Sequence, residues 1–207
     1  MNFILHLDTS GNKCYVAISK NGKLLSERIS NNEREHAARI NSLIENALKE
    51  ASLLLQNLNA IAVIGGPGSY TGLRIGLATA KGICYALNIP LIMHNKLELL
   101  VLHQIENSKK NYTRYAAILP ARENEYFVAV TDKNLKPILA PQHIIATDWN
   151  AWESDSMCIV GDGVQEVDID YPIWHSKAAL DFKNNNFADL VLATPFYLKE
   201  VHTTTKK

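Results

Sequence analysis

The order of strand and helix patterns along this 207-residue chain predicts an α/β fold. Two observations lead to that prediction. The first thirty residues contain three runs rich in apolar residues, and short turn signals separate them. After them, apolar residues spaced three and four positions apart alternate with short apolar runs, as in helices interleaved with buried strands. We therefore expect antiparallel strands first, followed by helix-and-strand units.

The first region, residues 3–30, is predicted to form three antiparallel strands. The first strand ends at the turn signal Thr9-Ser10-Gly11, and residues 14–20 and 23–30 supply the other two. Asn21-Gly22 lies between them and favours a type I′ turn, because both residues tolerate a positive φ.

Two helices and a buried strand are predicted next. The first helix is expected at about 32–55, where Asn31 or Asn32 can cap its start. The strand 61–64 leads into a second helix at about 71–87, which Asn88 and Pro90 stop. One face of the first helix is apolar, and its members are Ile40, Leu43, Ile44, Ala47, Leu48 and Ala51.

The remaining sequence predicts a second, smaller lobe. A strand at 91–94 and a helix at 97–106 precede the polar, basic stretch 107–111, so we divide the chain into lobes 1–107 and 108–207, with the final segment able to return to the first lobe. The strands predicted in the second lobe span 116–119, 126–132 and 158–160. Pro137 and Pro141 are expected to break the chain between them, and from Ala178 onward only short helical stretches fit.

Composition excludes several classes of protein. Lys and Arg number 21 and so do Asp and Glu, so the chain lacks the basic surface of a protein that grips nucleic acid alone. Three widely spaced cysteines without a CxxC pair support neither a disulfide framework nor a zinc cage, and buried reduced thiols are expected. No signal peptide or membrane-spanning run is evident, which predicts a cytoplasmic protein.

The most distinctive motif is the glycine-rich turn at 66–76, which joins a predicted strand to a helix. Such a turn can cradle a phosphate with its backbone N–H groups. A Walker A loop, however, ends in Gly-Lys-Ser/Thr, whereas Lys81 lies well inside the predicted helix. We therefore reject a nucleotide P-loop and expect no cofactor.

Small residues form a stripe along the second helix, and the sequence allows two explanations for it. Each helical glycine costs about 0.8–1.0 kcal/mol relative to alanine, so two on one face indicate a close neighbour. That neighbour is either the chain's own sheet or a helix of a partner, and local physics does not choose between them. The stripe comprises Gly72, Gly76, Thr79, Ala80 and Ile83.

Neither catalytic nor metal-binding residues can be defended from spacing. His36 opens the first helix, but Ile40 stands where the second ligand of a metal-binding helix would lie. Asp8, Thr9 and Ser10 follow the first strand, where the carboxylate could orient a metal or phosphate or bond its own turn.

Taken together, these stretches resemble the TsaB family, formerly called YeaZ. The resemblance rests on residues 4–10, on His36 and on the run 66–77, and Ala80-Lys81-Gly82 continues it. It is strong over roughly the first hundred residues. Weaker matches are Ala121-Arg122, Gly161-Asp162-Gly163 and residues 195–199.

The resemblance implies an actin-like ATPase fold (ASKHA, RNase H-like) with two lobes, and a role in forming N6-threonylcarbamoyladenosine beside the anticodon of tRNAs that read ANN codons. It implies a non-catalytic subunit that binds a TsaD-type transferase, with a TsaE-type ATPase binding the pair. tRNA would then be contacted only through the complex, and the chain alone could form a homodimer. Asp8, Thr9 and Ser10 would be a vestigial phosphate loop.

The partner surface is predicted on the two N-terminal helices, which would form a four-helix contact. Two alternatives remain in view, an M22-like metalloprotease and an independent actin-fold ATPase. The predicted interface residues are His36, Ile40, Leu43, Ile44, Ala47, Gly72, Leu73, Gly76, Thr79 and Ala80.

Overall fold

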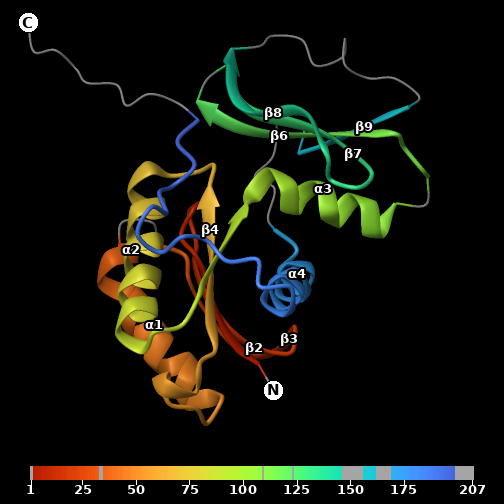
Figure 1. Cartoon of the computed structure of the whole chain (residues 1–207). Helices are drawn as coiled ribbons and strands as arrows, with labels where there is room; N and C mark the ends of the chain where they lie inside the picture. The colour runs from red at the N-terminus through yellow and green to blue at the C-terminus, as the bar shows by residue number, and fades with distance from the viewer. Residues whose placement is uncertain are drawn as a thin grey trace, which may run out of the picture. The chain divides into compact units, whose positions relative to one another are not determined.

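The computed structural model in Figure 1 describes residues 2–32, 35–108, 110–122, 124–145, 156–161 and 169–198. The chain divides into two compact units, of which the first comprises Met1–Leu99 and Ile169–Phe196 and the second Leu100–Asp168 and Tyr197–Lys207. The division therefore falls inside a helix and not at residue 107, because Leu99 packs into the core of the first unit.

The first unit is built on a five-stranded mixed sheet with the order β3-β2-β1-β4-β5. β1, β2 and β3 are antiparallel as the sequence predicted, and β1, β4 and β5 run parallel. Asn21 and Gly22 between β2 and β3 have φ values of 51° and 80°, as their turn requires. The strands are β1 Phe3–Asp8, β2 Cys14–Lys20, β3 Lys23–Ser30, β4 Ala60–Gly66 and β5 Leu91–Asn95.

Two helices, α1 (His36–Glu50) and α2 (Tyr70–Leu87), cover one face of this sheet (Figure 1). The prediction for α1 was too long at both ends. Its N-cap is Glu35, without a side-chain cap bond, and Ser52 adopts a φ of 55° beyond its last turn. Leu53 N–H then donates to the carbonyl of Leu48, which closes the helix end before the short 3₁₀ helix η2 (Leu55–Asn57).

The second helix begins and ends as its sequence predicted. The hydroxyl of Ser69 accepts the N–H of Gly72, and Asn88 ends the helix in the left-handed conformation at a φ of 54°.

The opposite face of the sheet is covered by α4 (Tyr171–Lys183), which the sequence analysis missed. We expected only short helical stretches after Ala178, yet the helix starts earlier. The carboxylate of Asp170 caps it by accepting from Ile173 N–H, and Pro172 lies in its first turn. Trp174 is fully buried against the sheet, so this helix contributes a large part of the second core.

The second unit contains a four-stranded sheet with the order β8-β7-β6-β9, in which β6 and β9 run parallel and the other pairs antiparallel. Pro137 and Pro141 were expected to break the chain, but both lie in β8. A strand tolerates them there because it is at the sheet edge and its register shifts against β7. The elements are α3 Lys96–Asn107, which begins in the first unit, β6 Arg114–Arg122, β7 Glu125–Asp132, β8 Pro137–Ile145 and β9 Met157–Val160.

The broad expectations from composition agree with the structure. The three cysteines are free and buried, as predicted for reduced thiols. None of the helices that the structure describes is long and apolar enough to cross a membrane. Of the motif at 161–163, only Gly161 falls within the described residues.

Candidate functional site

The inner side of α2 packs directly on the loop between β1 and β2. A Cβ added at Gly72 would overlap the carbonyl oxygen of Thr9, and one added at Gly76 would overlap the hydroxyl oxygen of the same residue. The Thr9 hydroxyl donates to the carbonyl of Gly72 at 2.7 Å. The glycines therefore accommodate the chain's own loop, and the idea that they admit a partner helix is corrected.

The loop itself is occupied by these internal contacts. Asp8, Thr9 and Ser10 are all buried, and a carboxylate oxygen of Asp8 accepts the N–H of Ser10 at 2.8 Å. The Ser10 carbonyl in turn accepts the N–H of Ser69 at 2.7 Å, and an added Cβ at Gly68 would overlap that carbonyl. The glycine-rich turn thus lies against the loop that, in the phosphate-loop hypothesis, would face a nucleotide.

His36 is also directed inward. Only 1% of it is exposed, and its Nε2 lies 3.0 Å from the carbonyl oxygen of Gly11. Most of the predicted interface residues share this position within the core, because they form the sides of α1 and α2 that meet the sheet. Leu43 and Thr79 are half-buried, whereas the buried ones are His36, Ile40, Ile44, Ala47, Gly72, Leu73, Gly76 and Ala80.

The outward side of α2 carries a second set of small residues that the sequence analysis missed. Ala78, Gly82 and Ala86 recur every four residues and are all exposed. No described atom lies within 4 Å of a Cβ built on Gly82, so the space there is open. Tyr85 beside them is 84% exposed. The spacing of these residues was a signal available in the sequence.

The outward side of α1 is polar. Its exposed residues are small or charged, and Arg39 forms an ion pair with Glu35 at 2.9 Å. The further exposed positions on this side are Ala37, Ala38, Asn41, Ser42, Glu45, Asn46 and Lys49.

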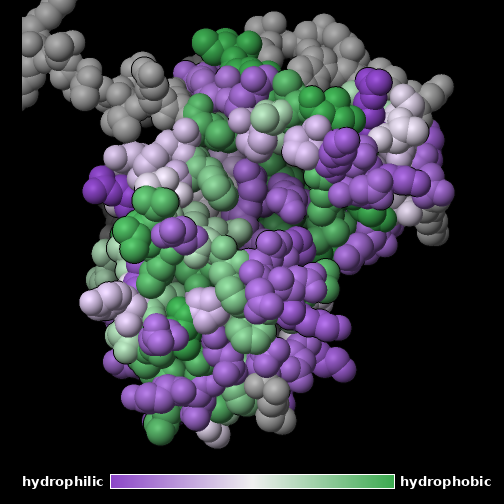
Figure 2. Space-filling view, in the orientation of Figure 1, coloured by the Kyte–Doolittle hydropathy of each residue, from purple (hydrophilic) through white to green (hydrophobic). Residues whose placement is uncertain are grey.

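A segment from the C-terminal part of the first unit crosses α2 (Figure 1). The ammonium of Lys81 donates to the carbonyl oxygens of Val191 and Ala193 at 3.1 and 3.0 Å. This gives Lys81 a structural role that its place inside the helix did not reveal. Figure 2 shows hydrophobic colour where the segment and α2 meet, and Val191 and Leu192 are 84% and 75% exposed.

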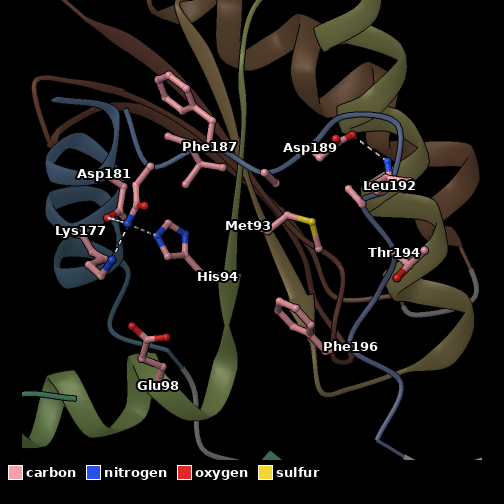
Figure 3. Close-up of a pocket in the computed structure, with 14 residues that line it drawn as sticks. Met93, His94, Glu98, Lys177, Asp181, Phe187, Asp189, Leu192, Thr194 and Phe196 are labelled. Atoms are coloured by element: carbon pink, nitrogen blue, oxygen red, sulfur yellow. Dashed lines mark hydrogen bonds and ion pairs between the residues drawn. The ribbon is translucent and has the colours of Figure 1, made fainter. Parts of the chain in front are cut away.

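A cavity of about 530 Å³ lies on the other side of the segment 186–196, within the first unit. β5 supplies Met93 and His94, the first turn of α3 supplies Glu98, and α4 supplies Lys177 and Asp181 (Figure 3). The lining from the segment itself is Asn186, Phe187, Ala188, Asp189, Leu192, Ala193, Thr194 and Phe196.

Asp181 organises the charged end of this cavity. Its carboxylate accepts from His94 Nε2 at 2.8 Å, from the ammonium of Lys177 and from Asn186 Nδ2 at 3.2 Å. Burial raises the pKa of Asp181, but these three donors outweigh burial and lower the pKa to about 2. The carboxylate is therefore charged at neutral pH, and it fixes the position of the Lys177 side chain.

The protonation of His94 follows from its two partners. Trp174 Nε1–H donates to His94 Nδ1 at 2.9 Å, so Nδ1 is the acceptor and Nε2 carries the proton that Asp181 receives. Both ring nitrogens are then engaged, and His94 serves to hold Asp181 in place.

Two more buried histidines lie under α4. His6 Nε2 is 2.8 Å from the hydroxyl of Ser19, and His175 Nε2 is 3.1 Å from that of Tyr15. Burial lowers the pKa of His6 well below its ordinary value, with the neighbouring His175 and His94 adding to the effect. Burial likewise lowers the pKa of His175 to about 4, against a smaller opposing effect of Asp170. Both rings are neutral at pH 7.

Within the part of the chain that the structure describes, no group of three or more His, Cys, Asp or Glu side chains could hold a metal ion. A mixed five-stranded sheet covered by helices on both faces, followed by a second sheet, defines the class as the actin-like ATPase fold.

Comparison with known proteins narrows this class. A family model described as TsaD, tRNA N6-adenosine threonylcarbamoyltransferase, matches residues 23–198. The relative named tRNA threonylcarbamoyladenosine biosynthesis protein TsaB from Bacillus subtilis is 29% identical over 70% of this chain, and the match spans 63% of that relative's length. The protein of the same name from Haemophilus influenzae is 28% identical over 96% of this chain and 84% of its own length.

Solved structures agree on the fold. YeaZ from Pseudomonas aeruginosa has a TM-score of 0.71 at 24% identity, over 96% of this chain and 100% of that one. The chain belongs to the tRNA threonylcarbamoyladenosine family that the matching model describes, and its relatives group it with the TsaB (YeaZ) members.

Proposed function

We propose that this chain is a non-catalytic subunit of N6-threonylcarbamoyladenosine formation in tRNA, and that it docks onto a TsaD-type transferase through the outward sides of α1 and α2. The observation that carries the proposal is the open row of small residues Ala78, Gly82 and Ala86 on α2. Small side chains let the backbones of two helices approach closely, and Tyr85 beside them offers a large apolar anchor.

The fold of the partner supports a helix-to-helix contact. Because the transferase family model matches this chain over 23–198, a TsaD-type partner carries helices equivalent to α1 and α2. Pairing of equivalent helices gives a four-helix contact of pseudo-twofold symmetry. The same surface can pair with a second copy of this chain when the partner is absent.

The accessory role is supported by the state of the loop at Asp8, Thr9 and Ser10. Its carbonyls and hydroxyls bond the glycine-rich turn, so we interpret it as a vestigial phosphate loop. A TsaE-type ATPase then supplies nucleotide chemistry to the assembly. With no net charge, the lone chain contributes little counterion release, so tRNA binds through the complex. A metalloprotease or an independent ATPase has no comparable observation in its favour.

The substitution Gly82→Leu tests the docking surface. Its side chain enters open space, so the fold should keep its melting temperature, while the leucine holds a partner helix away. Overpacking a fitted contact costs about 1–3 kcal/mol, which is roughly a tenfold to hundredfold loss of affinity. Co-expression with the transferase from the same organism and gel filtration measure this loss.

Leu180→Glu provides the matched control, because Leu180 is an exposed apolar residue on α4, on the opposite face of the sheet. It should leave the complex intact. If Gly82→Leu folds and binds the transferase with native affinity, the contact lies elsewhere.

A further inference from the structure

The cavity beside α4 takes no part in the proposed docking surface, which lies on the other face of the sheet. Its volume of about 530 Å³ falls in the range of small-molecule sites, roughly 300–1,000 Å³. In Figure 3, Met93 lies in the middle of the lining with Phe187 and Phe196 on either side of it. An apolar group of a ligand would be surrounded by these three side chains.

The charged end of the cavity presents two groups of opposite sign. Figure 3 shows the ammonium of Lys177 and the carboxylate of Glu98 at the same end. No ion pair among the described residues joins the two, although each lines the cavity. They are near neighbours that do not neutralise each other directly.

The other charges of the lining are already engaged. Asp181 accepts from His94, Lys177 and Asn186, and a carboxylate oxygen of Asp189 accepts the backbone N–H groups that follow it, at 2.8 and 2.9 Å. An ammonium has three N–H donors, and Asp181 receives one of those of Lys177. Lys177 therefore keeps donors for a ligand, and Glu98 keeps its acceptor oxygens.

We propose that this cavity binds a free α-amino acid with an apolar side chain as its zwitterion. The ammonium and carboxylate of such a molecule lie on one carbon, so they need opposite charges at one end of a site. Glu98 would accept from the ammonium, Lys177 would donate to the carboxylate, and the side chain would lie against Met93 and the two phenylalanine rings. The proposal is independent of the docking surface.

Methionine methyl NMR offers a direct experiment on the full-length protein. The chain has three methionines, Met1, Met93 and Met157, of which Met93 lines the cavity and Met157 lies in β9 of the other unit. Titration with L-phenylalanine should shift the Met93 methyl signal saturably and leave Met157 unchanged. Phenethylamine and 3-phenylpropionate, which each carry one of the two charges, should bind at least tenfold more weakly.

Variants assign the two charged contacts. Glu98→Gln and Lys177→Met should each weaken L-phenylalanine binding about tenfold or more, whereas Glu106→Gln, on the exposed end of the same helix as Glu98, should have no effect. The Glu98 variant alone suffices if loss of Lys177 disturbs the fold. Absence of a saturable Met93 shift, equal binding of the amine or the carboxylate, or an unaltered affinity in Glu98→Gln would each overturn the proposal.

Discussion

The two faces of the first sheet are held by different kinds of contact. On one face, α1 and α2 pack through aliphatic residues and through glycines that admit the carbonyl of Thr9. On the other face, α4 packs through Trp174 together with a polar network that includes His94 and Asp181. The first face depends on shape and the second on protonation states, so mutation and pH should affect them differently.

Gly72→Ala should produce the largest loss of stability, on the face that depends on shape. The new Cβ would overlap a backbone carbonyl, which cannot rotate away as a side chain can. We expect unfolding to become easier by about 3 kcal/mol, at the upper end for overpacking. Urea denaturation measures this loss. A change below about 0.5 kcal/mol, the usual range for surface substitutions, would show that the loop yields easily.

Asp181→Asn examines the polar face. The amide keeps the size of the side chain but removes the charge that receives His94 and Lys177. Hydrogen bonds to a charged group contribute about 1.5–3 kcal/mol, so we expect a loss of about 2 kcal/mol at pH 7. The loss should shrink as the pH falls from 3.8 towards 2, where the wild-type carboxyl is itself protonated. A loss that persists at pH 2 would argue against a charge effect.

Mild acid should weaken the polar face before it affects the other. The pKa values of His6 and His175 are lowered in the folded protein, so the unfolded chain binds more protons below about pH 6.5. Stability should therefore fall by about 1 kcal/mol between pH 7 and 6, and further towards pH 5. Denaturation at the three pH values follows this trend, and His175→Gln should reduce the slope by about half. A slope of zero in the wild-type protein would mean that neither ring takes up a proton on unfolding.

Gly82→Ala should have the smallest effect and the opposite sign. The position is open and helical, so alanine gains helix propensity without a clash. We expect stabilisation by about 0.5–1 kcal/mol, measured by the same denaturation. Destabilisation would indicate a neighbour at Gly82 in the free chain, and it would weaken the case for an open docking surface.

Much of the first unit could be predicted because its signals are local. Asn21-Gly22 requires a particular turn, and the apolar spacing of α1 and the caps of α2 act within a few residues. The missed helix α4 shows the limit of this approach. Its buried positions include His175 and Asp181 beside Trp174, and polar residues at core positions conceal the apolar period by which a helix is detected.

The sequence by itself determined the family, the α/β class and the order of the strands in the first unit, because these follow from short motifs and from periodicity. Only the tertiary structure decided what each surface meets. It turned Gly72 and Gly76 towards Thr9 and left Gly82 open, since a small residue indicates that space is needed without naming the neighbour. It also brought Glu98 and Lys177, far apart in sequence, to one cavity, because the packing of α3 and α4 around β5 is a long-range property of the fold.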